Sequence, residues 1–296
     1  MLESIRSQQT AAGEACLEGR GLHSGEHCRL RMKPAPPGSG IVFVRKDLSG
    51  SPRITARPEN VISTVRAVDL GRNGDKLVRT VEHLLAACAG LNIDNLLVEM
   101  EGPEVPAGDG SALTLVEKLE SAGIREQDEE LMAYRPEEKL GCHQQENYLI
   151  ILPAGETSYH YQLDYGERPP GRQLLSFFPE EEDFAGSLAP ARTFVLEEEI
   201  KTLKEKGLAR GGSRENAVIF SRQGAENELR FSDEAARHKL LDLMGDLFLA
   251  GPVLGRIIAV RSGHTLNHRL ARILHKERQR ELRKLEEKED IHGQKL

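Results

Sequence analysis

Long apolar runs are absent from the sequence, and no segment approaches the roughly 20 residues that a helix needs to cross a bilayer. The N-terminal segment MLESIRSQQTAAGEACLEG also lacks the charged and then apolar layout of a secretory signal. We therefore expect no transmembrane segment and a cytoplasmic location. Cysteine is scarce as well, and the 4 cysteines form no CxxC pair. This spacing disfavours a disulfide framework and a structural zinc ribbon.

A strong charge of one sign is also lacking. The formal net charge is -7 over 296 residues, and basic residues are interspersed with acidic ones except near the C-terminus. A nucleic-acid-binding surface normally needs a basic patch or stripe, so we expect no nucleic-acid partner. Small neutral or anionic ligands fit this composition better.

The length suits two modest domains, each able to bury a core of its own. The acidic, proline-containing segment REQDEELMAYRPEEKLGCHQQEN is the best boundary between them. We predict an N-terminal domain over 1–126, a linker over 127–146, a C-terminal domain over 147–275 and a charged tail over 276–296. The tail has few apolar residues, which is typical of a solvated helix or a frayed end.

Similar patterns recur in the two halves of the chain. HCRLRMK and GIVFVRK alternate like strands and are separated by the turn-rich PAPPGSG, which predicts a β-hairpin or meander. NYLIILPA and TSYHYQLDY open the second half in the same way. Each half then continues with a helix, a strand and a second helix, and aligning the first helices places His83 against His238. We predict an α+β fold of two similar domains, each a small sheet with two helices on one face.

The segment RHKLLDLMGDL combines a leucine-rich face with three polar residues spaced four apart, His238, Asp242 and Asp246. On a helix these side chains stack along one side, so His238 and Asp242 could share a metal ion. Zinc ions used for hydrolysis usually have three protein ligands, His or carboxylate, and one position for water. A surface or capping ion pair is the commoner meaning of this spacing, but the surrounding leucines favour ligation because unpaired charges are costly to bury.

His83 is the leading candidate for a third ligand, because it is the counterpart of His238 in the other half. Glu82 beside it could act as a general base on a water at the metal, or it could be a solvent-facing helix acid. His264 of RSGHTLNHRL lies at a strand-to-helix junction, where side chains often point into a site. Asp246 could orient this imidazole and favour its protonated form, or His264 could simply begin a helix.

Five motifs, in order along the chain, carry a resemblance to a known family. They are TVEHLLAACAGLNIDNLLVEMEGPEVPAGDGSA, PARTF, GLARGGSRENAVIF, RHKLLDLMGDLFLAG and SGHTLNH. The chain resembles the UDP-3-O-acyl-N-acetylglucosamine deacetylases, zinc-dependent amidohydrolases that release acetate from a 3-O-acylated sugar nucleotide in lipid A biosynthesis. The likeness runs from GRGLHSG to LARIL, nearly the whole chain.

The resemblance implies two α/β sandwich domains of the β-α-α-β type, with the active site at the interface between them. It implies a zinc ion, with ferrous iron as the alternative. The implied metal ligands are His83, His238 and Asp242. These are the residues that the spacing brought forward.

The resemblance also implies catalytic roles. Glu82 is the general base, and His264 is the protonated partner that Asp246 orients. Thr193 of PARTF places its hydroxyl beside the carbonyl oxygen of the substrate, although without the family a plain strand or turn hydroxyl is the natural interpretation. The proton for the leaving amine could come from Glu82 or from His264.

The implied partner is UDP-3-O-acyl-N-acetylglucosamine, and we expect a monomer. Lys239 is implied to bind the sugar nucleotide, with Phe194 packing against it; alone, they would be a solvated lysine and a core aromatic. The family's inserted β-α-β unit corresponds to residues near 194–222 and forms the passage for the acyl chain. The residues assigned to this unit as substrate contacts are Ile200, Leu203 and Gly212.

Two other functions compete with this interpretation. A catalytically silent relative could bind sugar nucleotides or a partner, but every catalytic position of the family pattern is present. An amidohydrolase with a different acylated substrate is the second alternative. The acyl-passage segment distinguishes the two substrates, because a charge at Ile200 or Leu203 should weaken the processing of an acylated sugar.

Overall fold

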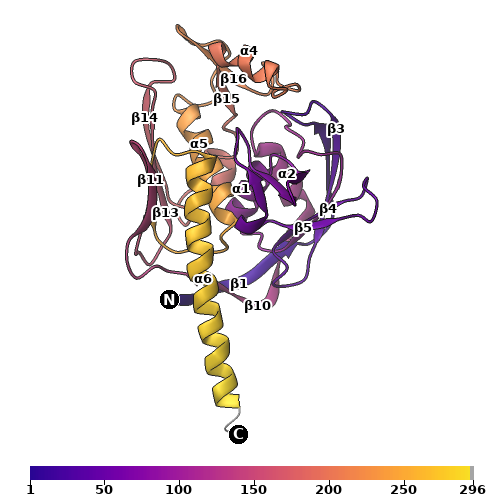
Figure 1. Ribbon diagram of the computed structural model, residues 1–296, viewed down its shortest axis with the longest axis vertical. Helices are drawn as coiled ribbons and strands as arrows, with labels where there is room; N and C mark the ends of the chain where they lie inside the picture. The colour runs from indigo at the N-terminus through magenta and orange to yellow at the C-terminus, as the bar shows by residue number, and fades with distance from the viewer. Residues whose placement is uncertain (294–296) are drawn as a thin grey trace.

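The computed structural model describes residues 1–293, with side chains through Glu287. Two five-stranded sheets lie on opposite sides of the molecule, and helices fill the space between them (Figure 1). The first sheet has the order β2 (Ala15–Arg20), β3 (His27–Pro34), β9 (Leu96–Glu101), β4 (Ile41–Arg45) and β5 (Arg53–Thr55). The second has the order β11 (Leu140–Gln144), β12 (Asn147–Leu152), β18 (Arg256–Val260), β13 (Ser158–Asp164) and β14 (Arg172–Phe177).

Each sheet carries two helices on its inner face. They are α1 (Glu82–Gly90) and α2 (Leu113–Ala122) in the first half, and α5 (Glu234–Phe248) and α6 (His264–Gly293) in the second. The helices α1 and α5 pack directly against each other, so the two sandwiches meet through their helix layers. The prediction of an α+β fold with two similar sandwiches is confirmed.

The predicted hairpins or meanders are wrong in one respect, and wrong in the same way in both halves. Strands β3 and β4 do not pair, because β9 lies between them, antiparallel to β3 and parallel to β4. Strand β18 likewise lies between β12 and β13. The segments do form strands, but the turn-rich connection between them crosses over a third strand that comes later in the sequence.

Alternating burial explains why these segments form sheets with one covered face. In β3 the buried positions are Cys28, Leu30 and Met32, and the arginines between them are exposed. Strand β12 alternates in the same way, with Leu149 and Ile151 buried. A period of two places one buried apolar row toward the helices and one more exposed row toward the other face of the sheet.

A small unit is inserted at the same point of each half, between the fifth strand of the sheet and the helix that follows. In the first half it is a 3-10 helix (Pro58–Asn60) and a sheet of β6 (Val61–Ser63), β7 (Asp69–Arg72) and β8 (Asp75–Val78). In the second it is α3 (Phe184–Ser187), β15 (Phe194–Leu196), α4 (Glu197–Glu205), β16 (Val218–Ser221) and β17 (Gly224–Ala225). The parallel pairing of β15 with β16 around α4 matches the predicted β-α-β unit.

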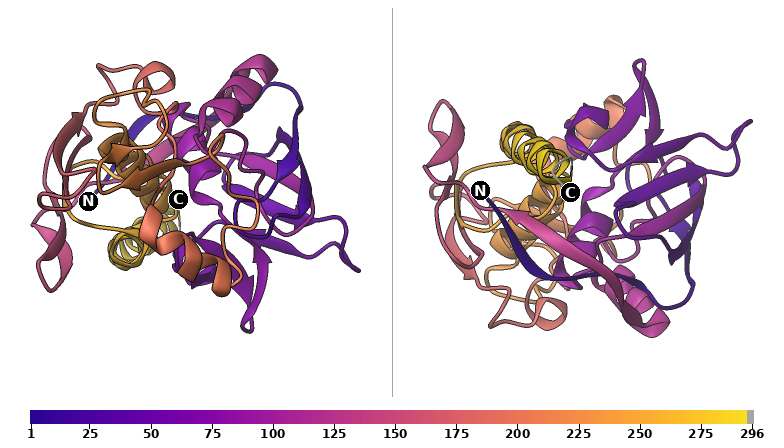
Figure 2. Two further views of the ribbon diagram at one scale, coloured as in Figure 1. Left: turned by 90° about the horizontal axis from the view of Figure 1, so that it is seen from above. Right: turned by 90° about the horizontal axis from the view of Figure 1, so that it is seen from below.

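A two-stranded ribbon joins the halves at the end far from α4. Strand β1 (Leu2–Ala11) pairs antiparallel with β10 (Ile124–Tyr134), and the ribbon crosses beneath the helices in the right-hand view of Figure 2. Much of the segment predicted as a linker therefore lies in strands β10 and β11. The domain limits at 126 and 147 stay predictions.

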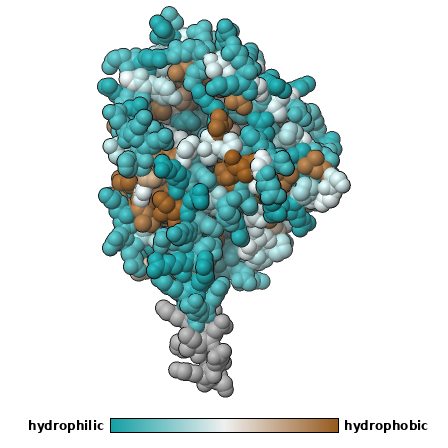
Figure 3. All heavy atoms as spheres, viewed as in Figure 1, coloured by the Kyte–Doolittle hydropathy of each residue, from teal (hydrophilic) through white to brown (hydrophobic). Residues whose placement is uncertain are grey.

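Helix α6 continues from the core into the region predicted as a charged tail. Its side chains are exposed from Arg283 to Glu287, as a solvated helix requires. The face of the molecule in Figure 3 is mainly hydrophilic, with apolar residues in separate small areas. Among the described residues, we find no helix with the length and apolar character to span a bilayer.

The helices α1 and α5 approach each other closely because of Gly245. A methyl group at Gly245 would overlap with the carbonyl oxygen of Glu82, which belongs to the backbone of α1 and cannot rotate away. The missing side chain therefore lets the first turn of α1 lie against the middle of α5. This contact brings His83 to the helix that carries His238 and Asp242.

We expect Gly245→Ala to lower the free energy of unfolding by about 1–3 kcal/mol, because the added methyl group must push α1 away from α5. Urea unfolding of the purified variant measures this change. Gly155→Ala is the matched control, since a methyl group there meets no atom within 4 Å, and its effect should stay within about 0.5 kcal/mol. Equal stabilities of the two variants would show that the helices tolerate the methyl group.

Candidate metal centre and active site

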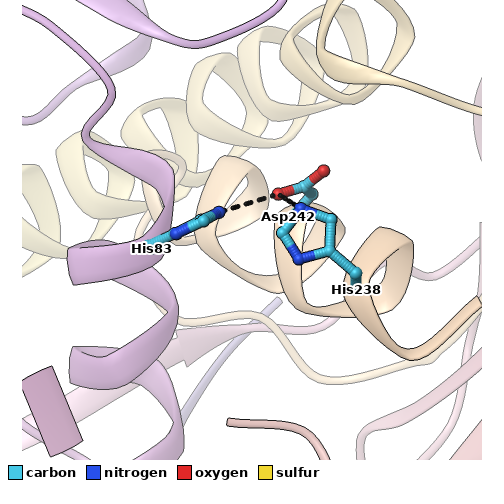
Figure 4. A group of neighbouring side chains, drawn as sticks. All are labelled: His83, His238 and Asp242. Atoms are coloured by element: carbon cyan, nitrogen blue, oxygen red, sulfur yellow. Dashed lines mark ion pairs between the residues drawn. The ribbon is translucent and has the colours of Figure 1, made fainter. Parts of the chain in front are cut away.

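His83, His238 and Asp242 converge in the structure, as predicted. His83 comes from the first turn of α1, and the other two lie one turn apart on α5, all pointing toward one another (Figure 4). Oxygen Oδ1 of Asp242 is 3.6 Å from Nε2 of His83 and 3.5 Å from Nε2 of His238. One donor atom from each residue lies within 4.8 Å of the others, which is the arrangement of a three-ligand metal site.

The surroundings of His238 and Asp242 leave these two groups in the protonation states that bind a cation. Burial lowers the pKa of His238 to about 3, so its imidazole is neutral. Its Nδ1 is 3.1 Å from the carbonyl oxygen of Ala191, and a proton donated there leaves Nε2 free as a ligand. Burial alone would raise the pKa of Asp242, but the positive charges of Lys239 and His264 outweigh it and hold the pKa well below the usual range. The carboxylate is therefore charged.

Glu82 is buried, which excludes the solvent-facing alternative. Its side chain is 3% exposed, and its Oε2 accepts a hydrogen bond from the backbone N–H of Val68 at 3.0 Å. Burial raises the pKa of Glu82 to about 7, against the opposing influence of His264 and His83. A carboxyl group with a pKa near neutrality can both accept and return a proton.

His264 begins α6, and it also has the partner that the sequence predicted. Its Nδ1 is 2.9 Å from Oδ2 of Asp246, while its Nε2 is 3.8 Å from Oδ2 of Asp242. Burial alone would lower the pKa of His264, but the carboxylates of Asp246 and Asp242 raise it to about 9. The imidazole is therefore positively charged at neutral pH. The side-chain amide of Asn267 donates to the same Oδ2 of Asp246 at 2.8 Å.

Glu82, the three donors of the metal centre and His264 line a cavity of about 360 Å³ that is walled by both halves. Asp246 is fully buried behind His264 and does not line it. The other walls of the cavity come from the β2–β3 and β11–β12 turns, the two inserted units and the β18–α6 junction. A larger hollow of about 870 Å³ lies at the C-terminal end of α5, but none of the predicted site residues lines it. Candidate catalytic residues line only the smaller of these two cavities, so we take the smaller one as the active site.

The predicted substrate contacts divide into two groups. Thr193, Phe194 and Lys239 line the cavity, and the ammonium of Lys239 lies 2.7 Å from Oδ2 of Asp242 and 5.8 Å from the ring centre of Phe194. Ile200, Leu203 and Gly212 do not line it. Leu203 is buried within the α4 unit instead.

Sequence reasoning missed Glu104, which holds the rim of the cavity together. Its carboxylate is fully buried and accepts hydrogen bonds from the backbone N–H groups of His23 and Ser24, at 2.9 and 2.7 Å. It also accepts from the hydroxyl of Thr80 at 2.8 Å. Thr80 lies two residues before Glu82 and has a φ of 56°, a conformation that residues other than glycine rarely adopt. An isolated acid between the prolines of GPEVP was the available signal.

Arg66, Tyr165 and Arg261 also line the cavity, and no motif in the sequence pointed to them. Arg66 belongs to the first inserted unit and forms an ion pair with Glu199 of α4, in the second inserted unit. The two insertions therefore touch beside the cavity. Together with Lys239, the two arginines give the cavity lining three cationic side chains, which we call the cationic wall.

The comparison with protein families decides the family. Residues 8–276 match the family model described as UDP-3-O-acyl N-acetylglycosamine deacetylase. The chain belongs to this family. The resemblance seen in the sequence motifs is thus confirmed.

Individual relatives support the membership of this deacetylase family. The UDP-3-O-acyl-N-acetylglucosamine deacetylase of Myxococcus xanthus is 43% identical over 277 residues, which cover 92% of this chain and 87% of the relative. Relatives with the same name are 44% identical in Thermosynechococcus vestitus and 42% identical in Chlamydia caviae, again over 92% of this chain, and over 95% and 97% of their own. The protein is therefore an enzyme of a deacetylase family whose members use a metal ion.

Proposed function

We propose that the chain hydrolyses the N-acetyl amide of UDP-3-O-acyl-N-acetylglucosamine, the lipid A biosynthesis step of its family, with a zinc ion held by His83, His238 and Asp242. The observation that carries this proposal is the convergence of these three donors at the interface of the two halves. We further propose the domain limits given above, a cytoplasmic location, where nucleotide sugars are made, and a monomeric enzyme. Each half supplies ligands to one shared site, which supports a site complete within one chain.

The donor set fits zinc. Two imidazoles and one carboxylate match the ligands of catalytic zinc sites, which keep a fourth position for water or substrate. The carbonyl of Ala191 supplies the outer contact that usually orients a histidine ligand. When bound, zinc polarises a carbonyl group and lowers the pKa of water. Ferrous iron accepts the same donors and is the alternative metal.

Glu82 is the proposed general base. It precedes His83 on the first turn of α1, lines the cavity, and has a pKa raised to about 7 by burial. The hydrogen bond from Val68 holds one carboxylate oxygen and so fixes the direction of the other. Glu82 then takes a proton from the attacking water and can return it to the leaving amine.

His264 and Thr193 are the proposed partners of the oxyanion that forms on the carbonyl oxygen. The charged imidazole of His264 is fixed by Asp246, so its Nε2–H remains available to donate toward the cavity. Thr193 lines the same cavity. Two donors to that oxygen favour the charged tetrahedral state over the neutral amide, and this difference accelerates the reaction.

The cationic wall is the proposed contact for the sugar nucleotide. Lys239 lines it beside the metal ligands, and Phe194 offers an aromatic face. Attraction of a diphosphate by Lys239 is the chemistry expected of an ammonium group in this position. We propose that the acyl chain extends toward the α4 unit, where Ile200, Leu203 and Gly212 lie outside the polar cavity.

The test removes and restores the metal. We expect the protein freed of metal by a chelator to release no acetate from a 3-O-acylated UDP-N-acetylglucosamine, and zinc to restore turnover. A series of acyl lengths and the unacylated sugar nucleotide, assayed together, tests the substrate and the acyl passage. Full turnover in the chelated protein would contradict the metal role. Equal kcat/KM for the acylated and unacylated substrates would contradict the acyl passage.

A further inference from the structure

The segment Ala191–Thr193 serves the site at two of its three positions. The carbonyl oxygen of Ala191 faces Nδ1 of His238 at 3.1 Å, and Thr193 lines the cavity. Arg192, between them, faces away from the cavity and is 8% exposed. Whatever holds Arg192 therefore sets the position of both neighbours.

Glu234 holds Arg192 by its backbone and its side chain at once. Oxygen Oε1 of Glu234 accepts from the backbone N–H of Arg192 at 3.1 Å and from its Nε at 2.8 Å. Oxygen Oε2 accepts from Nη2 of Arg192 at 3.2 Å and from the backbone N–H of Arg230 at 2.7 Å. The guanidinium also donates to the carbonyl oxygen of Glu228 at 2.6 Å. Both carboxylate oxygens are thus fully used.

The location of Glu234 on α5 links this contact to the metal ligands. Glu234 is the first residue of α5 and lies four positions before His238, so the two side chains stack on one side of the helix. One carboxylate thereby fixes the segment that carries Ala191 to the same helix face that carries His238. Glu234 therefore fixes the position of the Ala191 carbonyl relative to the imidazole of His238.

We propose that Glu234 and Arg192 are positioning residues: they hold the Ala191 carbonyl against His238 and Thr193 beside the metal centre. The proposal rests on the proposed function, because it assigns His238 to the metal. The competing explanation is a purely structural ion pair. A buried pair broken on one side destabilises a protein wherever it lies, so loss of stability alone does not distinguish the two.

The test compares two carboxylates that each bind an arginine and a backbone N–H group. Asp94 also binds an arginine with both oxygens, through Arg6 at 2.7 and 2.9 Å, and also accepts a backbone N–H, from Gln9 at 2.7 Å. It lies beyond the C-terminal end of α1, in the lining of the larger hollow and away from the metal ligands. Glu234→Gln and Asp94→Asn therefore remove the same charge from similar networks, one beside the site and one far from it.

We expect Glu234→Gln to bind zinc about 10–100-fold more weakly, measured by competition with a chromophoric chelator, as is usual when an outer contact of a ligand is disturbed. Its cobalt(II) form should show a shifted visible absorption, because that spectrum reports ligand geometry. Asp94→Asn should lose thermal stability yet keep the zinc Kd and the cobalt spectrum of the wild type. Arg192→Lys keeps the charge but loses the planar guanidinium group, which binds a carboxylate through two N–H groups. This variant should show an intermediate zinc Kd.

Several outcomes would overturn the inference. A wild-type zinc Kd and cobalt spectrum in both Glu234→Gln and Arg192→Lys would show that the contact is only structural. An equal loss of zinc affinity in Asp94→Asn would attribute the effect to general destabilisation. If the wild-type protein itself took up no zinc, the proposed function would be wrong, and the inference would fall with it.

Discussion

The double variant His238→Ala, Asp242→Ala is expected to lose stoichiometric zinc and all measurable acetate release. Disturbing one outer contact of a metal ligand costs about 10–100-fold in affinity, so removing two of three ligands should weaken zinc binding by more than about 10²-fold. His83 alone would remain from the triad. Elemental analysis of the purified variant after dialysis measures the zinc content.

The histidine control for this variant is His268→Ala. His268 is on α6 and partly buried, and its Nε2 bonds to the carbonyl oxygen of Pro58 at 2.9 Å, outside the cavity. This variant should keep one zinc ion per molecule and its turnover. Stoichiometric zinc in the double variant would show that the metal binds elsewhere.

Glu82→Gln is expected to keep zinc and to lose about 10²–10⁴-fold in kcat, the range that a positioned general base contributes. The amide carbonyl of glutamine can still accept the hydrogen bond from Val68, so the fold around the residue should persist. What disappears is the ability to take a proton. Steady-state acetate release at saturating substrate, together with the zinc content, separates these two properties.

Glu99→Gln provides the carboxylate control. Glu99 is on β9, where it pairs with Lys33 at 2.9 Å on the sheet, outside the cavity. It should leave kcat and zinc content unchanged. An unchanged kcat in Glu82→Gln would remove Glu82 as the base, whereas loss of zinc would reassign it to holding the metal.

The sequence predicted where the strands and helices lie along the chain better than it predicted which strands pair with each other. Alternation along β3 and β12 shows which side chains are buried, because a strand has a period of two. It does not show which strand lies alongside. Strands consecutive in sequence are neighbours in most sheets, and the hairpin prediction followed that tendency. The parallel pairings of β4 with β9 and of β13 with β18 depend on contacts between distant segments, for which local patterns carry no signal.

The residues of the site also divide into those that local sequence spacing could predict and those that only the fold brings together. His238, Asp242 and Asp246 could be found from a spacing of four on one helix, and His83 from its alignment with His238. The carbonyl of Ala191 could not, because every residue has a backbone carbonyl and only the fold selects one. The pairing of Glu234 with Arg192 spans 42 residues, so its two partners gave no joint signal.

The packing of α1 against α5 also bears on how such a site could arise. His83 and His238 occupy equivalent positions on equivalent helices, so a symmetric dimer of a single ancestral half could have presented both histidines to one ion. The alignment places Ala87 opposite Asp242 and an arginine opposite Glu82. The carboxylate ligand and the proposed base therefore occur once each, on different copies. A symmetric dimer would present every group twice, so a site with one carboxylate ligand and one base requires two halves whose sequences differ.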